Sequence, residues 1–136
     1  MARRSEQRRK AVFALYQHDV TGRPLSETLD RDAPLFTRAL AHAAEDYSED
    51  TDAIIERFAQ GWTIDRIAPL ERAIMRVALT EMLHPDALPG DHPIPPEGAI
   101  EEAVRTAKTY AGAQAPKFVN GILGAALREM REDPGR

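Results

Sequence analysis

Residues 69–82 read PLERAIMRVALTEM, and this stretch decides the fold class. Its apolar residues recur every three or four positions, which is the spacing of one buried face of an α-helix. They are Leu70, Ile74, Val77, Ala78 and Met82. The preceding Pro69 is suited to the first helical position, because its fixed φ is already helical and its missing N–H would have no partner there. The stretch therefore predicts a helix that buries an apolar face.

The same periodicity continues on both sides of this segment. It predicts a first helix over 5–20 that stops at Gly22, one long helix of about seven turns between Pro34 and Gly61, and helices from Glu97 and from Pro116 onward. Ala, Leu, Glu and Arg are abundant and aromatic residues make up only 6% of the chain, a composition that favours helix over sheet. The predicted fold class is an all-α helical bundle.

Residues 84–96 interrupt the helical pattern with five prolines and Gly90. This composition blocks both helix and central strand, so we expect an exposed, stiff Pro-rich loop. The chain of 136 residues shows no internal repeat and fits one domain over residues 1–136.

Several classes of function lose support from the composition. The absence of cysteine excludes disulfides, thiolate zinc sites and a cysteine nucleophile, and indicates a cytoplasmic protein. No apolar run approaches the roughly 20 residues of a membrane span. The four histidines lack metal-binding spacing, and no Gly-rich nucleotide loop or nucleophile elbow occurs. We therefore expect no catalytic site, no metal, no cofactor and no membrane partner.

Charge is distributed unevenly along the chain. The first ten residues contain five basic side chains and one acidic side chain, a net charge of +4, so the remaining residues carry −8 of the total of −4. A basic segment over 1–10 on an acidic body predicts one defined edge that binds a polyanion. A solvated N-terminus without a partner is the alternative interpretation.

Three segments carry a resemblance to a known family. The first is the arginine-rich opening that leads into Ala14-Leu15-Tyr16, the second covers residues 64–82, and the third runs from Ala99 to the Lys117-Phe118-Val119-Asn120-Gly121 motif and on to Leu123. In this order they resemble the NusB family of bacterial transcription antitermination factors. The resemblance implies a single NusB-like RNA-binding domain, an all-α bundle of two packed helical subdomains.

The resemblance also implies a function. A protein of this kind binds boxA-type single-stranded RNA together with NusE, a small-subunit ribosomal protein, and supports rRNA transcription. Other Nus factors and RNA polymerase would be indirect partners, and a homodimer stays open because the family contains monomers and dimers. Two alternatives remain: an RNA-binding subunit or domain related to rRNA methyltransferases, and a protein-only helical scaffold.

Family members face RNA with residues that correspond here to Arg3, Arg4, Arg8, Lys117 and Phe118. The chemistry suits that role, because guanidinium groups make forked hydrogen bonds to phosphate and single-stranded RNA exposes base faces on which an aromatic ring stacks. Core packing at a helix start is the other interpretation of Phe118.

The NusE-facing side would include Tyr16 and Glu71. A tyrosine combines a large apolar face with a polar tip, which suits a protein interface as well as a buried anchor of the first helix. A glutamate two positions after Pro69 also suits the positive end of a helix dipole. We expect Gly121 and Gly124 to let another helix approach closely.

Overall fold

The computed structural model describes residues 3–132, so residues 1–2 of the basic segment and 133–136 of the predicted domain lie outside the described residues. The helices of this range are α1 (Arg4–Thr21), α2 (Leu25–Thr28), α3 (Leu35–Asp46), α4 (Ser48–Phe58), α5 (Pro69–Leu83), α6 (Pro96–Tyr110) and α7 (Ala115–Glu132). Short 3₁₀ turns occupy Ile64–Arg66 and Pro85–Ala87. No strand occurs within 3–132, which confirms the all-α prediction.

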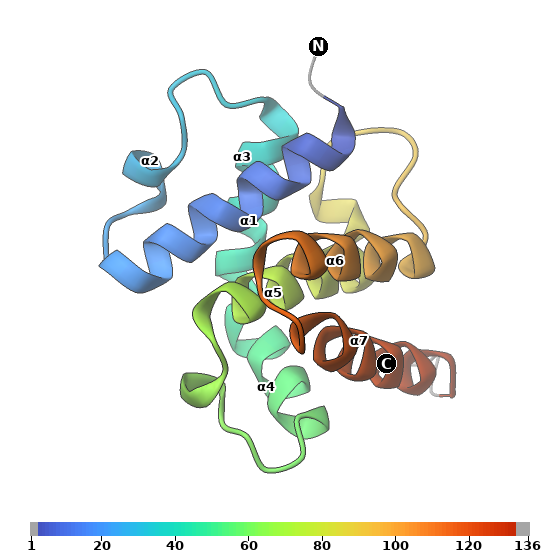
Figure 1. Ribbon diagram of the computed structural model, residues 1–136. Helices are drawn as coiled ribbons and strands as arrows, with labels where there is room; N and C mark the ends of the chain where they lie inside the picture. The colour runs from blue at the N-terminus through green and yellow to red at the C-terminus, as the bar shows by residue number, and fades with distance from the viewer. Residues whose placement is uncertain (1–2, 133–136) are drawn as a thin grey trace.

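Helix α5 is the centre of the fold. It packs against α1, α3, α4, α6 and α7 (Figure 1). Every residue from Ala73 to Met82 is buried, including Arg76, Thr80 and Glu81. The predicted helix is therefore confirmed, but it is buried on all sides rather than on one apolar face.

Two helical subdomains meet on α5. Helices α1, α2 and α3 pack together in the upper part of Figure 1, while α4, α6 and α7 form the lower part with α5. Ion pairs fasten both parts to the central helix, since Arg72 binds Asp19 of α1 at 2.8 Å and Arg76 binds Asp52 of α4 at 2.7 Å. Arg72 also donates to the carbonyl oxygen of Ile64 at 3.0 Å, which holds the connector before α5.

The prediction of one long helix between Pro34 and Gly61 is wrong. The helix breaks at Tyr47, whose backbone angles are φ −95° and ψ 11°, and α4 begins at the next residue. The Tyr47 ring stacks on the ring of His84 at the end of α5, with centroids 3.7 Å apart. The break lets α3 pack on α1 while α4 turns to α7. Apolar periodicity continues across the break, so the pattern alone could not reveal it.

The Pro-rich loop is largely exposed, as its composition predicts, but it does not stand free of the core. Leu88 and Ile94 are half-buried and pack against the core, and Pro96 opens α6. A cavity of about 730 Å³ separates the loop from Phe36 and from the first turns of α1. No helix of the described chain is long and apolar enough to cross a membrane.

Candidate nucleic-acid interface

The basic segment is helical from Arg4 onward. Arg3 precedes the helix with an extended backbone, φ −69° and ψ 156°, and its carbonyl accepts a hydrogen bond from the Gln7 amide at 3.0 Å. Arg3 itself is exposed. Because successive residues of a helix point about 100° apart, the arginines of this segment cannot all face one partner.

Arg8 faces the interior of the molecule, whereas Arg4, one turn earlier, is exposed. The Nε of Arg8 donates to both carboxylate oxygens of Glu81, at 2.7 and 2.9 Å, and the two side chains are only 12% and 3% exposed. Burial raises the pKa of the Glu81 carboxyl, and the Arg8 guanidinium opposes that rise. One turn earlier, the Arg4 guanidinium lies 4.1 Å from the centroid of the Phe36 ring and donates to Gln7 at 2.7 Å. The Arg8 side chain is therefore already engaged within the fold.

Arg9 lies on a different face of α1, about 100° around the helix from Arg8. Its guanidinium lies 6.0 Å from the centroid of Tyr110, and that ring meets Phe13 edge-on with centroids 5.1 Å apart. No carboxylate of residues 3–132 forms an ion pair with Arg9. The sequence prediction gave Arg9 no role, although the spacing of Arg9, Phe13 and Tyr16 would have placed the three on one helical face.

Lys117 and Phe118 occupy the first turn and a half of α7. Lys117 is exposed, whereas Phe118 is half-buried and packs against the core on one side. The rest of the Phe118 ring lines a surface groove of about 550 Å³ between α7 and the end of α4. The ring therefore packs against the core and keeps an accessible surface, and its contact with RNA stays a prediction.

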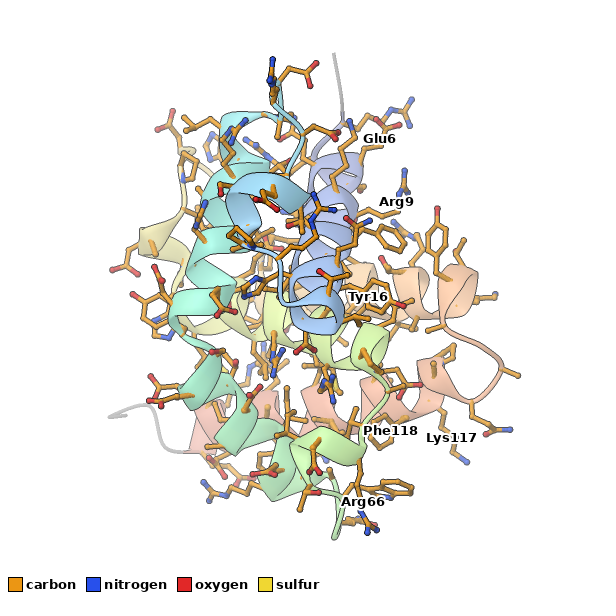
Figure 2. The ribbon with its side chains drawn as sticks, turned by 90° about the vertical axis from the view of Figure 1, so that its left-hand side faces the viewer. Glu6, Arg9, Tyr16, Arg66, Lys117 and Phe118 are labelled. Atoms are coloured by element: carbon orange, nitrogen blue, oxygen red, sulfur yellow. The ribbon has the colours of Figure 1, made fainter. Side chains whose placement is uncertain are left out.

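The outward residues form one row. In Figure 2 the labelled side chains of Glu6, Arg9 and Tyr16 follow α1 along the right-hand side of the view, and those of Phe118, Lys117 and Arg66 continue below them. The structure thus brings Lys117 and Phe118 to the side on which Arg9 lies. Arg8 points away from it, into its ion pair with Glu81.

Tyr16 and Glu71 lie on two helices that pack together, α1 and α5. Tyr16 is half-buried against the core, and Glu71 is half-buried in the first turn of α5. Burial raises the pKa of the Glu71 carboxyl. Both side chains keep an accessible part, so their assignment to a partner stays a prediction.

The model of the NusB family matches residues 5–128. The chain belongs to the NusB family. Among its relatives is the transcription antitermination protein NusB of Rubrobacter xylanophilus, 38% identical over 137 residues that cover 93% of this chain and 90% of the relative. NusB proteins are non-enzymatic antitermination factors, in agreement with the prediction from sequence.

Solved structures of NusB proteins share the fold. T. maritima NusB superposes with a TM-score of 0.79 at 29% identity, covering 94% of this chain and 92% of that one. A complex of the antitermination factors NusB and NusE with double-stranded RNA superposes with a TM-score of 0.76 at 27% identity. The match covers 93% of this chain and 96% of that one. These likenesses confirm the NusB-like helical bundle.

Two glycines of this NusB family member do not behave as predicted. A Cβ added to Gly121 would meet no atom within 4 Å, and one added to Gly124 would meet only Arg128 of the same helix, at 3.8 Å. Neither glycine allows a close helix contact, so that prediction is wrong. Gly121 instead lines the groove beside Phe118.

Among residues 3–132 there is no cluster of three or more His, Cys, Asp or Glu side chains suited to a metal ion. Every buried side-chain nitrogen and oxygen of that range has a hydrogen-bond partner. The outward row gathers accessible basic and aromatic side chains, with Glu6 as the one acidic member labelled in Figure 2.

Proposed function

We propose that this protein is a transcription antitermination factor that binds boxA-type single-stranded RNA together with NusE and so supports rRNA transcription in the cytoplasm. Other Nus factors and RNA polymerase are its indirect partners. One observation carries the proposal: Arg9 and Lys117, which form no ion pair with any residue of 3–132, lie on one side of the molecule with the accessible ring of Phe118 (Figure 2).

The RNA contacts follow from the chemistry of these side chains. Lys117 supplies a point charge for a phosphate, and the Phe118 ring supplies a face for a base. Arg9, held over Tyr110, supplies a guanidinium on the same side. Arg3 is exposed before α1 and is a further candidate for a phosphate contact. The family resemblance alone supports Arg4 and Arg8 as RNA contacts. Arg4 is exposed, whereas Arg8 is engaged by Glu81, so we assign Arg8 mainly to holding α1 in place.

The solved NusB and NusE complex contains double-stranded RNA, which makes the form of the ligand a matter for experiment. We favour a single strand, because an aromatic side chain stacks only on a base whose face is free. NusE would contact the side that includes Tyr16 and Glu71. The solved complex supports NusE as a partner, and the accessible part of both side chains supports their assignment to that partner.

The direct test is a set of RNA titrations followed by fluorescence anisotropy. A boxA-like single strand, a scrambled single strand and a duplex are each titrated with and without NusE. The proposal predicts that the boxA-like strand binds most tightly and that NusE increases its affinity. Equal binding of all three RNAs, with no effect of NusE, would contradict it and favour the protein-only scaffold.

The partner surface is tested separately by Tyr16→Ala and by charge reversal, Glu71→Lys. An aromatic anchor in an interface is typically worth about 2 kcal/mol, so Tyr16→Ala should weaken the NusE complex by about thirtyfold. Gln17→Ala, at the exposed neighbouring position, is the matched control. Loss of helical circular dichroism in Tyr16→Ala would show that the residue anchors the core instead.

A further inference from the structure

Trp62 is the only tryptophan of the chain, and 53% of its surface is exposed. It follows a tight turn at the end of α4, in which Gln60 and Gly61 have φ values of 51° and 96°. The Trp62 amide closes this turn by donating to the carbonyl oxygen of Ala59 at 3.3 Å. An exposed ring of this size leaves a large apolar area in water, and such surfaces mark sites of interaction when they adjoin others.

The ring adjoins the groove that Phe118 lines. Three aromatic side chains contribute to its wall, Phe58, Trp62 and Phe118, and three basic ones, Arg57, Lys117 and Arg128. No acidic side chain of the described residues lines it. Arg57 is paired with Glu129 at 2.7 Å, which leaves Lys117 and Arg128 as the stronger sources of positive charge. An aromatic wall with basic rims is the surface chemistry that binds single-stranded nucleic acid.

Gly121 lies in the same groove and has no packing partner. It is exposed within the helical part of α7, and a Cβ there would meet no atom within 4 Å. Glycine destabilises a helix interior relative to alanine, so nothing inside the chain accounts for its presence. The missing side chain leaves room for a ligand to approach the backbone of α7 next to Phe118.

We propose that the groove between Trp62 and Gly121 is a second nucleotide subsite, which takes the RNA nucleotides adjoining the one on Phe118. A base stacks on Trp62, the sugar and phosphate cross Gly121, and Lys117 and Arg128 neutralise the phosphates. This subsite rests on the proposed function, since one strand occupies Phe118 and Trp62 in turn. Stacking on tryptophan tolerates any base, so the subsite adds affinity and length of footprint rather than base specificity.

Fluorescence of the protein reports on this subsite directly, because Trp62 is the sole tryptophan. A boxA-like RNA is lengthened one nucleotide at a time at either end and titrated into the full chain. The subsite predicts that quenching of Trp62 and a gain in affinity appear at the same added nucleotide, at one end only. Binding without quenching at every length would overturn it.

Glycine variants give the matched pair for this test. Gly121→Ala should raise the melting temperature by roughly 2–4 °C, because alanine favours helix over glycine. The same variant should bind the longer RNA a few fold more weakly. Gly121→Gln should lower the affinity for the longer RNA by about tenfold. Gly124→Ala makes the same change one turn away, outside the groove, and should leave RNA affinity unchanged. Equal RNA affinity of all three variants would contradict the subsite.

Trp62→Ala should cost about tenfold in affinity for the longer RNA and little for the shorter one. If Trp62→Ala failed to fold, the RNA affinity of Gly121→Gln would still show whether RNA occupies the groove. Loss of binding in Phe118→Ala together with normal binding in the Trp62 and Gly121 variants would overturn the subsite and leave the proposed function intact. No binding of any RNA by the wild-type protein would overturn both. Variants that keep RNA affinity but lose NusE binding, or change the oligomeric state, would assign the groove to a protein and overturn the subsite.

Discussion

Arg8 and Arg9 are neighbours in the chain, yet their side chains lie in opposite surroundings. Arg8 is 12% exposed and binds a buried carboxylate, whereas Arg9 lies over the half-exposed ring of Tyr110 and has no ion-pair partner within residues 3–132. The number of arginines in a basic segment therefore does not give the number of phosphate contacts. The helical face of each arginine decides whether it serves the fold or a partner.

The same division holds beyond α1. On the inner side, Arg72 and Arg76 of α5 bind Asp19 and Asp52, so the charges are matched inside the molecule. On the outer side, Lys117 has no carboxylate partner among the described residues. Pairs of the inner side should therefore govern stability, and unpaired cations of the outer side should govern RNA affinity.

The largest expected effect is on stability and comes from Arg8. Arg8→Ala leaves Glu81 buried without its partner, which should cost about 3 kcal/mol of the free energy of unfolding. Arg9→Ala should change it by less than about 0.5 kcal/mol. Urea denaturation of the two variants measures both values. Replacing both members of the pair, by Arg8→Met with Glu81→Leu, should recover most of the loss, because apolar residues of similar volume remove the uncompensated charge. Equal stability of Arg8→Ala and Arg9→Ala would erase the distinction.

Substitutions of Phe118 test a residue that belongs both to the packed interior and to the outer face. Phe118→Ala should cost roughly 1–3 kcal/mol of RNA binding, and Phe118→Leu should lose most of that amount while it keeps the apolar contact with the core. Because the ring is half-buried, Phe118→Ala should cost less stability than the roughly 3–5 kcal/mol of a full core truncation. Anisotropy titration and thermal denaturation of both variants separate the two contributions. A full core loss with normal RNA binding per folded molecule would remove Phe118 from the interface.

Features that depend on a local sequence pattern could be predicted, and features that depend on contacts between distant residues could not. The α5 helix was predictable because its apolar spacing and Pro69 agree, and the outward place of Arg9 was open to prediction from helical spacing. The break at Tyr47 was not, because the apolar spacing continues across it, and the stacking of Tyr47 on His84 is a tertiary contact that no local pattern carries. The burial of Arg8 was not predictable either, since its partner Glu81 lies on another helix, 73 residues away.

A smaller effect on the free energy of unfolding is expected from a partly exposed pair, His18 and Glu45. The hydrogen bond from the His18 ring to the Arg23 carbonyl oxygen, with a lesser contribution from Glu45, raises the pKa of His18 above 6.5. A raised folded-state pKa stabilises the protein below the unfolded value, and this stability is lost as pH rises through the folded value. Urea unfolding at pH 6 and pH 8 should show a loss of about 0.5 kcal/mol or less that His18→Gln abolishes. The same pH dependence in His18→Gln would contradict the assignment.

The most direct test of the outer face is the salt dependence of RNA affinity in two folded variants. With roughly three to five phosphate contacts at about 0.7 counterions each, the wild-type slope of log K against log salt should be about −2 to −3.5. Arg9→Ala should weaken binding and flatten the slope by about 0.7, whereas Arg8→Met with Glu81→Leu should leave slope and affinity unchanged. An unchanged slope in Arg9→Ala, with a flattened slope in the Arg8 and Glu81 double variant, would contradict the division of α1 into a structural and an RNA-binding face.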